Sequence, residues 1–214
     1  MVKVLIKTSK LTLKLVGAAG LAPIAVFFQV SPPLFLTPWF MRLDFVAVPW
    51  IICWMLFGFK ASLICMVISA PLIGFLGPFA GGWVGALMKI SASIWMIIIP
   101  ALFTLKTKSS INLIKNKRLF ILTSLIAVLT RDLATVFLNL YFAIPVFFGM
   151  SPTQVLKFFT NPKFQSFLSR FLGLTWFSAY FSEVVFWNTI QGLIDLYTSL
   201  IIGLIILKRF KYFT

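Results

Sequence analysis

The sequence predicts an all-α integral membrane protein with six transmembrane helices and both termini in the cytoplasm. Three observations support this fold class. Of the 214 residues, 61% are apolar and the mean hydropathy is +1.05, which is far more than a water-soluble core requires. The apolar residues form continuous runs of about 20, the length that crosses a bilayer as a helix, instead of the alternating segments of a membrane β-barrel. Basic residues gather in short clusters between these runs.

Three predicted spans occupy the first half of the chain. The first span covers residues 15–30 and follows a lysine-rich stretch. A cleaved signal peptide has a similar outline, but five further spans follow this one. The second span covers residues 45–59 and the third covers residues 61–77, with Lys60 between them. Residues 31–43 form the first outer loop, and their Ser, Pro and aromatic content is typical of a lid over a binding site.

The second half contains the other three spans. The fourth span covers residues 82–105, and a strongly basic cytoplasmic loop, residues 106–118, connects it to a long fifth span over residues 119–148. A polar, proline-containing outer loop, residues 149–175, leads to the sixth span over residues 181–207. The whole chain, residues 1–214, is therefore predicted to be one transmembrane domain.

The distribution of positive charge predicts the orientation. With both termini inside, thirteen of the nineteen basic residues fall in cytoplasmic segments, and only Arg42, Lys157, Lys163 and Arg170 fall outside. Cytoplasmic loops of membrane proteins carry this excess. The net charge of +15 is thus explained by topology, and no nucleic-acid partner is expected.

Some residue types are absent or scarce, and this limits the possible chemistry. The chain has no histidine, which excludes Ser–His and Cys–His catalysis, histidine-ligated metals and haem. Its two cysteines, Cys53 and Cys65, lie in apolar runs and are expected to be buried free thiols. We therefore expect neither a metal site nor a cofactor in this chain.

Polar side chains inside the predicted spans are the candidate functional residues. A charged residue at the centre of a membrane helix costs about 2.5–3.5 kcal/mol on insertion scales. The residues of this kind are Lys89, Arg131, Asp132, Asn139, Asn188, Gln191 and Asp195, with Asp44 and Glu183 near the outer boundary.

Spacing places these groups on shared helix faces and at a common depth. Asn188, Gln191 and Asp195 share one face of the sixth span because three and four residues separate them. With a rise of about 1.5 Å per residue, Lys89, Asn139, Asn188 and Gln191 fall in the outer half of the membrane. Arg131, Asp132 and Asp195 fall near mid-depth, where we expect an internal ion pair; hydrogen bonds that only join helices are the alternative for the whole set.

Tryptophan is distributed on one side. Five of the seven tryptophans lie at or near the predicted outer boundary, whereas an interfacial belt would populate both faces. This bias favours an outward-facing pocket for a flat ligand with apolar and polar parts, to which Trp39 and Trp187 would contribute.

Several segments resemble a known family in their order along the chain. They are similar to signatures of the substrate-binding S components of energy-coupling factor (ECF) vitamin transporters, and most of all to the riboflavin type. The segments are residues 41–49 (MRLDFVAVP), 56–58 (LFG), 81–89 (GGWVGALMK), Arg131 with 139–145 (NLYFAIP), and 186–192 (FWNTIQG).

The resemblance implies a transport function and no enzymatic activity. S components are six-helix proteins of the prokaryotic plasma membrane that capture a vitamin from outside and dock on a transmembrane coupling protein bound to two ABC ATPases. ATP would be used by those partners, and this chain has no phosphate-binding P-loop motif. By resemblance, Ala18 and Ala22 would form the helix face that meets the coupling protein, with packing inside the chain as the alternative.

The resemblance also implies a substrate site. Asn139 and Asn188 would hydrogen-bond a flavin ring system, because an amide offers both a donor and an acceptor. The remaining expected substrate-binding residues are Asp44, Phe45, Lys89, Gln191, Trp39 and Trp187.

The sequence departs from the riboflavin-type pattern in two segments. Gln191 stands where that group usually has Lys, and residues 46–47 replace its usual Ser-Asp. Riboflavin or a related flavin is therefore the favoured ligand, and another heterocyclic vitamin or precursor is the first alternative. A non-transport assembly or structural protein is the second, and a membrane enzyme of lipid metabolism is disfavoured by four acidic residues without a metal motif.

Overall fold

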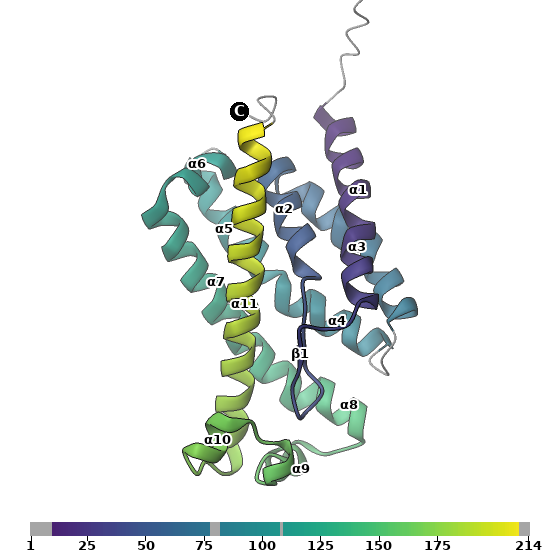
Figure 1. Cartoon of the computed structure of the whole chain (residues 1–214), viewed down its shortest axis with the longest axis vertical. Coiled ribbons are helices and arrows are strands. Elements are labelled where there is room, and N and C mark those ends of the chain that lie inside the picture. Colours follow the sequence, from purple (N-terminus) through teal and green to yellow (C-terminus); the bar gives the residue numbers. More distant parts are fainter. Residues whose placement is uncertain (1–9, 78–81, 108, 210–214) are drawn as a thin grey trace, which may run out of the picture.

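The computed structural model describes residues 10–77, 82–107 and 109–209 as a helical bundle with one two-stranded antiparallel sheet (Figure 1). The chain termini, with Lys3, Lys7 and Lys211, lie outside the described residues, as do Lys108 and residues 78–81. The elements in chain order are α1 (Lys10–Val30), β1 (Phe35–Leu36), β2 (Arg42–Leu43), α2 (Ala47–Phe57), α3 (Phe59–Leu76), α4 (Gly82–Ser93), α5 (Trp95–Thr107), α6 (Ser110–Lys115), α7 (Lys117–Leu138), the π-helix η1 (Asn139–Ala143), α8 (Ile144–Phe148), α9 (Pro152–Phe158), the 3₁₀ helix η2 (Pro162–Phe164), α10 (Phe167–Phe171) and α11 (Trp176–Arg209).

The described residues confirm the expected class, an all-α membrane protein, but not the number of spans. Five helical stretches in them are long and apolar enough to cross a membrane. They overlap five of the predicted spans: Leu11–Val30, Phe59–Leu76, Gly82–Leu105, Lys117–Phe148 and Trp176–Arg209.

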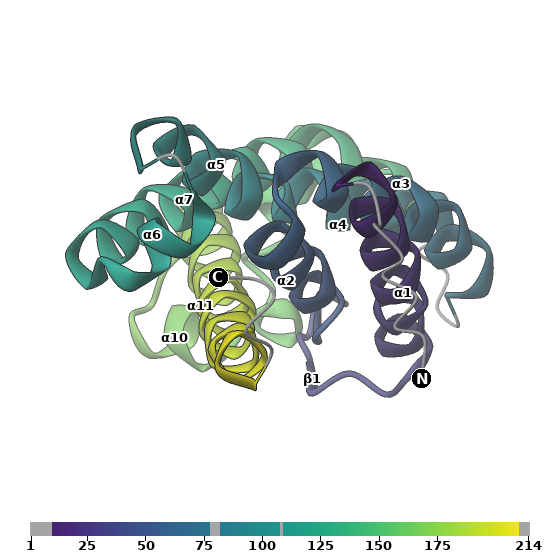
Figure 2. The same ribbon diagram turned by 90° about the horizontal axis from the view of Figure 1, so that it is seen from above.

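The span predicted over residues 45–59 is replaced by a short, buried helix. α2 has 11 residues, and residues 47–55 are all buried. At about 1.5 Å per residue it is about 16 Å long, roughly half of a 30 Å hydrocarbon core. It packs against α1, α3 and α11 and lies between them in Figure 2. Trp50, expected near the outer boundary, is fully buried here and donates a hydrogen bond to Ser69 of α3 at 2.8 Å.

Small residues of α1 pack inside the bundle, which corrects one prediction. Ala18, Ala22 and Ala25 are fully buried in the core against α2 and α3, and a Cβ on Gly17 would lie 2.4 Å from the Phe57 ring. Ala18 and Ala22 are therefore unavailable to a partner protein, because their face already forms the close helix contact that small residues permit. The exposed small residues of this helix include Gly20, and a Cβ added to Gly20 would have no neighbouring atom within 4 Å among the described residues.

Two of the long stretches are interrupted. A turn at Ile94 divides residues 82–105 into α4 and α5. The 119–148 stretch contains η1, in which the Ile144 N–H bonds back five residues to the Asn139 carbonyl. Pro145 follows at once; it has no N–H, and its ring crowds the carbonyl four residues earlier, so a widened turn here relieves the conflict.

Helical segments form a cap where an outer loop was predicted. Residues 149–175 contain α9, η2 and α10, and α11 begins at Trp176 instead of residue 181. α9 starts with a capping box in which Ser151 and Gln154 satisfy each other's backbone N–H groups. The buried Glu183 of α11 holds the cap: its Oε1 accepts from the Ser166 N–H at 2.8 Å and from the hydroxyls of Ser166 and Ser169.

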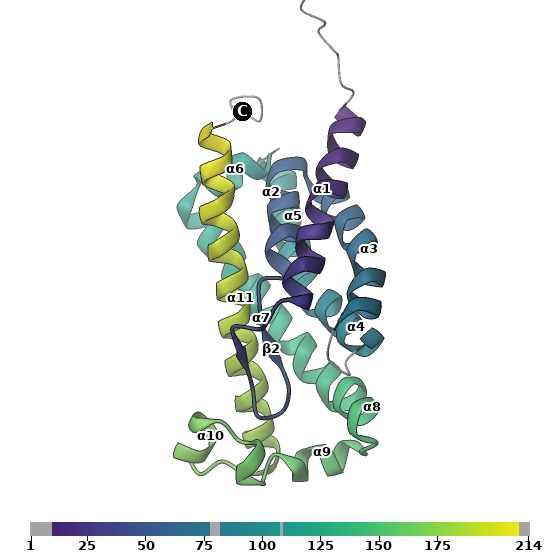
Figure 3. The same cartoon turned by 45° about the vertical axis from the view of Figure 1, so that its right-hand side comes forward.

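The two described ends of the chain lie at the same end of the bundle. α1 begins and α11 ends at the end of the bundle that also carries α6, whereas α9 and α10 lie at the opposite end and the strand hairpin lies in the half nearer to them (Figures 1 and 3). The cap end carries Lys157, Lys163 and Arg170, and the end with the described termini carries the basic residues of α6, of the first turn of α7 and of the last turn of α11.

Replacement of Ala18 by Leu should lower the free energy of unfolding by about 1–3 kcal/mol, because the larger side chain does not fit into the close contact with α2 and α3. Thermal unfolding of the detergent-solubilised variant should show a lower midpoint than wild type. Gly20→Leu is the matched control on the exposed face of the same helix and should keep the wild-type midpoint. Equal stability of both variants would contradict the packing described for α1.

Candidate functional site

A cavity of about 470 Å³ lies beneath the hairpin loop, in the half of the bundle that carries the cap. It is lined by residues of the loop between α1 and α2, and by α4, α7, η1, α8 and α11. Its roof includes Ala47, the first residue of α2. The short helix α2 occupies only part of the space between α1 and α11. The loop and the cavity occupy the remaining part of that space. Small-molecule sites have volumes of about 300–1,000 Å³, so a vitamin-sized ligand fits.

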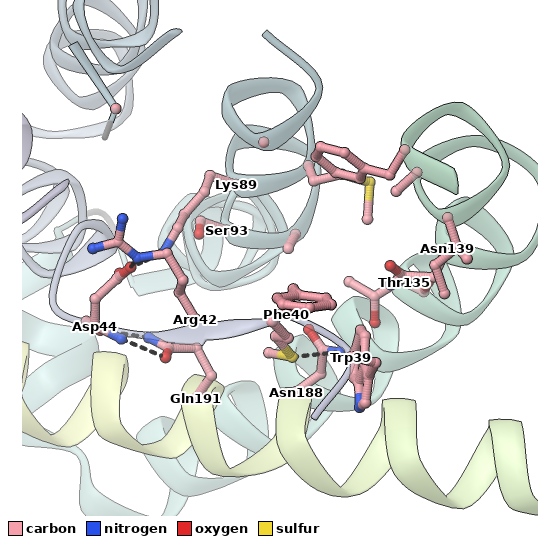
Figure 4. A pocket seen from close by; sticks show the side chains of 18 of the residues that line it. Trp39, Phe40, Arg42, Asp44, Lys89, Ser93, Thr135, Asn139, Asn188 and Gln191 are labelled. Carbon is pink, nitrogen blue, oxygen red and sulfur yellow. Dashed lines mark hydrogen bonds and ion pairs between the residues drawn. The ribbon is translucent and has the colours of Figure 1, made fainter. Parts of the chain in front are cut away.

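The loop that covers the cavity has a defined turn. Its strands pair Phe35 with Leu43, and at the tip the Thr37 N–H bonds to the Met41 carbonyl at 2.9 Å. Phe40 lies within this turn and has a φ of +69°, a conformation that is uncommon for an aromatic residue. The turn directs its ring, which is 61% exposed, toward the middle of the cavity (Figure 4).

One wall of the cavity is charged. The Asp44 carboxylate, which is 3% exposed, forms an ion pair with Lys89 of α4 and lies 3.9 Å from the Arg42 Nε. Its other oxygen accepts the Val46 N–H at 3.1 Å, just ahead of α2. Burial lowers the pKa of the Arg42 guanidinium, and the charge of Asp44 acts in the opposite direction. Asp44 therefore organises two cations at one side of the cavity.

Gln191 of α11 fastens this wall to the long helix. Its Oε1 accepts the Asp44 N–H at 3.0 Å, and its Nε2 donates to the Asp44 carbonyl at 2.6 Å. The same Nε2 donates to Asp195 Oδ1 at 2.8 Å. A side-chain amide thus replaces the two hydrogen bonds that a neighbouring strand would make with Asp44. At position 191, where the resemblance led us to expect Lys, the amide of Gln191 therefore fixes the backbone of Asp44 at the cavity wall.

An ion pair lies directly behind Gln191. Arg131 of α7 and Asp195 are both at least 96% buried, and the Arg131 Nη1 donates to Asp195 Oδ2 at 3.1 Å. α7 and α11 approach closely here, since a Cβ on Gly192 would lie 3.3 Å from Val128. The predicted pairing of Arg131 with Asp195 is present in the structure.

Asp132 is not part of this pair, contrary to the prediction. Its Oδ2 accepts a hydrogen bond from the Thr189 hydroxyl at 2.6 Å, and no ion pair involves it among the described residues. Adjacent residues on a helix point about 100° apart, so Asp132 meets a different part of α11 from Arg131.

The wall farther from Lys89 carries two amides. Asn139 and Asn188 each donate through Nδ2 to the carbonyl four residues earlier in their own helix, at 2.8 Å. No hydrogen bond to either Oδ1 comes from the part of the chain that the structure describes, so both carbonyl oxygens are left as acceptors on the cavity wall. Trp39, on the loop, lies between them in Figure 4 and packs edge-on against Phe159 of the cap.

Two expected substrate-binding residues lie elsewhere. Phe45 packs edge-on against Phe28 of α1, with ring centroids 5.6 Å apart. Trp187 stacks on Phe35 at 4.9 Å and donates its indole N–H to Glu183 at 3.2 Å. Neither lines the cavity. Trp187 is one residue from Asn188 and therefore points to another side of α11, where it braces the strand hairpin. The other six expected residues, Trp39, Asp44, Lys89, Asn139, Asn188 and Gln191, line the cavity together.

Several lining residues were not among the predicted binding residues. Phe40, Arg42, Thr135 and Phe148 belong to this group, and Arg131 lines the cavity besides forming its ion pair. Arg42 and Phe40 stand beside predicted residues in a loop whose path the sequence does not specify. Thr135 lies four residues before Asn139, and this helical spacing was an available signal.

The cavity offers hydrogen bonding and charge, and the described residues contain no group of three His, Cys, Asp or Glu side chains that could hold a metal ion. Cys53 and Cys65 are buried and free, as expected. Comparisons with protein-family models, curated proteins and solved structures each found no match to this chain.

Removal of either member of the Arg131–Asp195 pair should destabilise the protein by about 3–5 kcal/mol, because the remaining charge would be buried without its partner. The variants are Arg131→Leu, Asp195→Leu and the double substitution, compared by chemical unfolding in detergent. The double variant should be more stable than the sum of the single losses predicts. Strictly additive losses would show that the two side chains do not depend on each other.

Proposed function

We propose that this protein is a vitamin-capturing S component of an ECF-type importer, with riboflavin or a related flavin as the favoured ligand. The observation that carries the proposal is the cavity, whose wall holds the acceptor oxygens of Asn139 and Asn188 on two helices. The loop aromatics Trp39 and Phe40 lie over the same space. A flat ring system with N–H groups at its edge would hydrogen-bond to these oxygens and stack against the loop.

The distribution of charge supports an outward-facing cavity. The described ends of the chain share one end of the bundle with the basic residues of α6, of the start of α7 and of the last turn of α11. By the positive-inside rule that end is cytoplasmic, and the cavity then lies in the outer half of a prokaryotic plasma membrane. A capture protein for an external solute needs this orientation.

Transport would require partner proteins. A transmembrane coupling protein and two ABC ATPases would supply the ATP-driven step, and the surrounding lipid would allow the bundle to reorient. Because Ala18 and Ala22 are buried, the docking surface on α1 would be its exposed side, which includes Gly20.

The direct test is the ligand content of the purified protein. Protein solubilised in mild detergent should carry, or bind when added, a flavin that is detectable by its absorbance and by quenching of its fluorescence. Asn188→Ala should weaken binding at least tenfold, because it removes a side-chain oxygen that would accept a hydrogen bond from the ligand. Expression and thermal stability should stay near wild type.

The matched control is Asn161→Ala, an amide in the exposed cap that lies outside the cavity lining. It should leave binding unchanged. Colourless protein that fails to quench riboflavin would exclude a flavin and leave another heterocyclic vitamin or precursor. An Asn188→Ala variant that loses stability but not affinity would support the alternative of a structural or assembly protein.

A further inference from the structure

The charged wall of the cavity contains one more positive than negative charge. The chain has only four acidic residues, and the structure gives each of them a defined environment. Asp195 is paired with Arg131 at 3.1 Å. Asp132 binds Thr189, and Glu183 is held by the serines of the cap. Among the described residues, Asp44 is therefore the one carboxylate within 4.0 Å of both Arg42 and Lys89.

Both cations are located where an excess charge is costly. The Arg42 side chain is 8% exposed and the Lys89 side chain 19% exposed, and both line the cavity. A charge that is removed from water and lacks a counter-ion is strongly unfavourable in a low-dielectric site. An anionic group placed in the cavity would relieve this cost.

Lys89 also has hydrogen-bonding capacity left for such a group. Its ammonium has three N–H donors, and the described residues accept only one of them, through the Asp44 carboxylate. The Asp44 side chain is held in this position, because its second oxygen accepts the Val46 N–H and its backbone is hydrogen-bonded to Gln191. The remaining donors of Lys89 are thus held at the edge of the cavity.

We propose that the ligand of this cavity carries an anionic group, a carboxylate or a phosphate, that binds against Lys89 and Arg42, while N–H groups of its ring reach Asn139 and Asn188. Figure 4 shows these two sets of side chains on separate walls of the same pocket. This inference rests on the proposed function of the cavity as a capture site, and it narrows the substrate class from flavins and other heterocyclic vitamins in general to those that carry an anionic group.

Matched pairs of ligands test this inference. Riboflavin and flavin mononucleotide share one ring system and differ by a phosphate; biotin and biotin methyl ester differ by a free carboxylate. Affinities of the detergent-solubilised protein for all four are measured by fluorescence quenching or calorimetry. We expect the charged member of at least one pair to bind ten or more times tighter than its neutral counterpart.

Substitutions then locate the anion. Lys89→Gln should reduce the preference for the charged member to less than about threefold, because the ammonium that would bind the anion is removed; the measured quantity is the ratio of the two affinities within each variant, whatever happens to the affinity for the neutral member. Lys89→Arg keeps the charge and should retain the preference. Lys157→Gln removes one positive charge from the exposed cap and is the matched control for long-range attraction, so it should also retain the preference.

The outcomes separate this inference from the proposed function. Equal binding of both flavins, together with equal binding of biotin and its methyl ester, would overturn the anionic ligand and leave the flavin-binding function standing. If biotin binds and neither flavin does, the anionic ligand is supported and a flavin is excluded as the ligand. A preference that survives Lys89→Gln overturns the assignment to Lys89. If none of the four compounds binds, the anionic ligand and the flavin are both overturned, and the alternative of another heterocyclic vitamin or precursor is left.

Discussion

The site depends on how the protein satisfies the backbone of a non-helical segment inside an apolar bundle. Polar backbone groups at membrane depth need partners, because each unsatisfied group costs several kcal/mol there. At Asp44 the partner is the side-chain amide of Gln191, which bonds to both the N–H and the carbonyl. This contact lets the chain pass from the hairpin into α2 without a helix, and the space that a longer α2 would occupy becomes the cavity.

The same contact links the charged groups into one network. Gln191 also holds Asp195, which in turn holds Arg131, and the Asp44 that it fixes holds Lys89. The charged side chains of the loop, α4, α7 and α11 are therefore linked through Gln191 and held in fixed positions around the cavity. A connected buried network of this kind favours one arrangement of the helices, because separating its charged members would leave buried charges unpaired.

The sequence predicted part of the site from helix periodicity. The spacing of Asn188, Gln191 and Asp195 placed them on one face of α11, and all three lie where α11 meets the cavity or α7. Asp132 and Trp187 were assigned wrongly because the rotation of a helix about its axis decides which neighbour a side chain meets, and Phe45 was assigned wrongly because the path of the loop before α2 turns its ring toward Phe28. The partner of Ala18 was missed for a related reason: small residues permit close packing, but the pattern does not say against which helix.

What the sequence by itself determined is the class and the spans. Hydropathy over about 20 residues measures the cost of burial in lipid, which is local and additive along the chain, so five spans and their approximate bounds follow from it. The tertiary structure alone decided that α2 is short and central, that the cap is helical, and that Arg42 and Lys89 share a single carboxylate. These features arise from contacts between residues far apart in the chain, such as Asp44 with Gln191, and no local pattern encodes which distant partner satisfies a buried group.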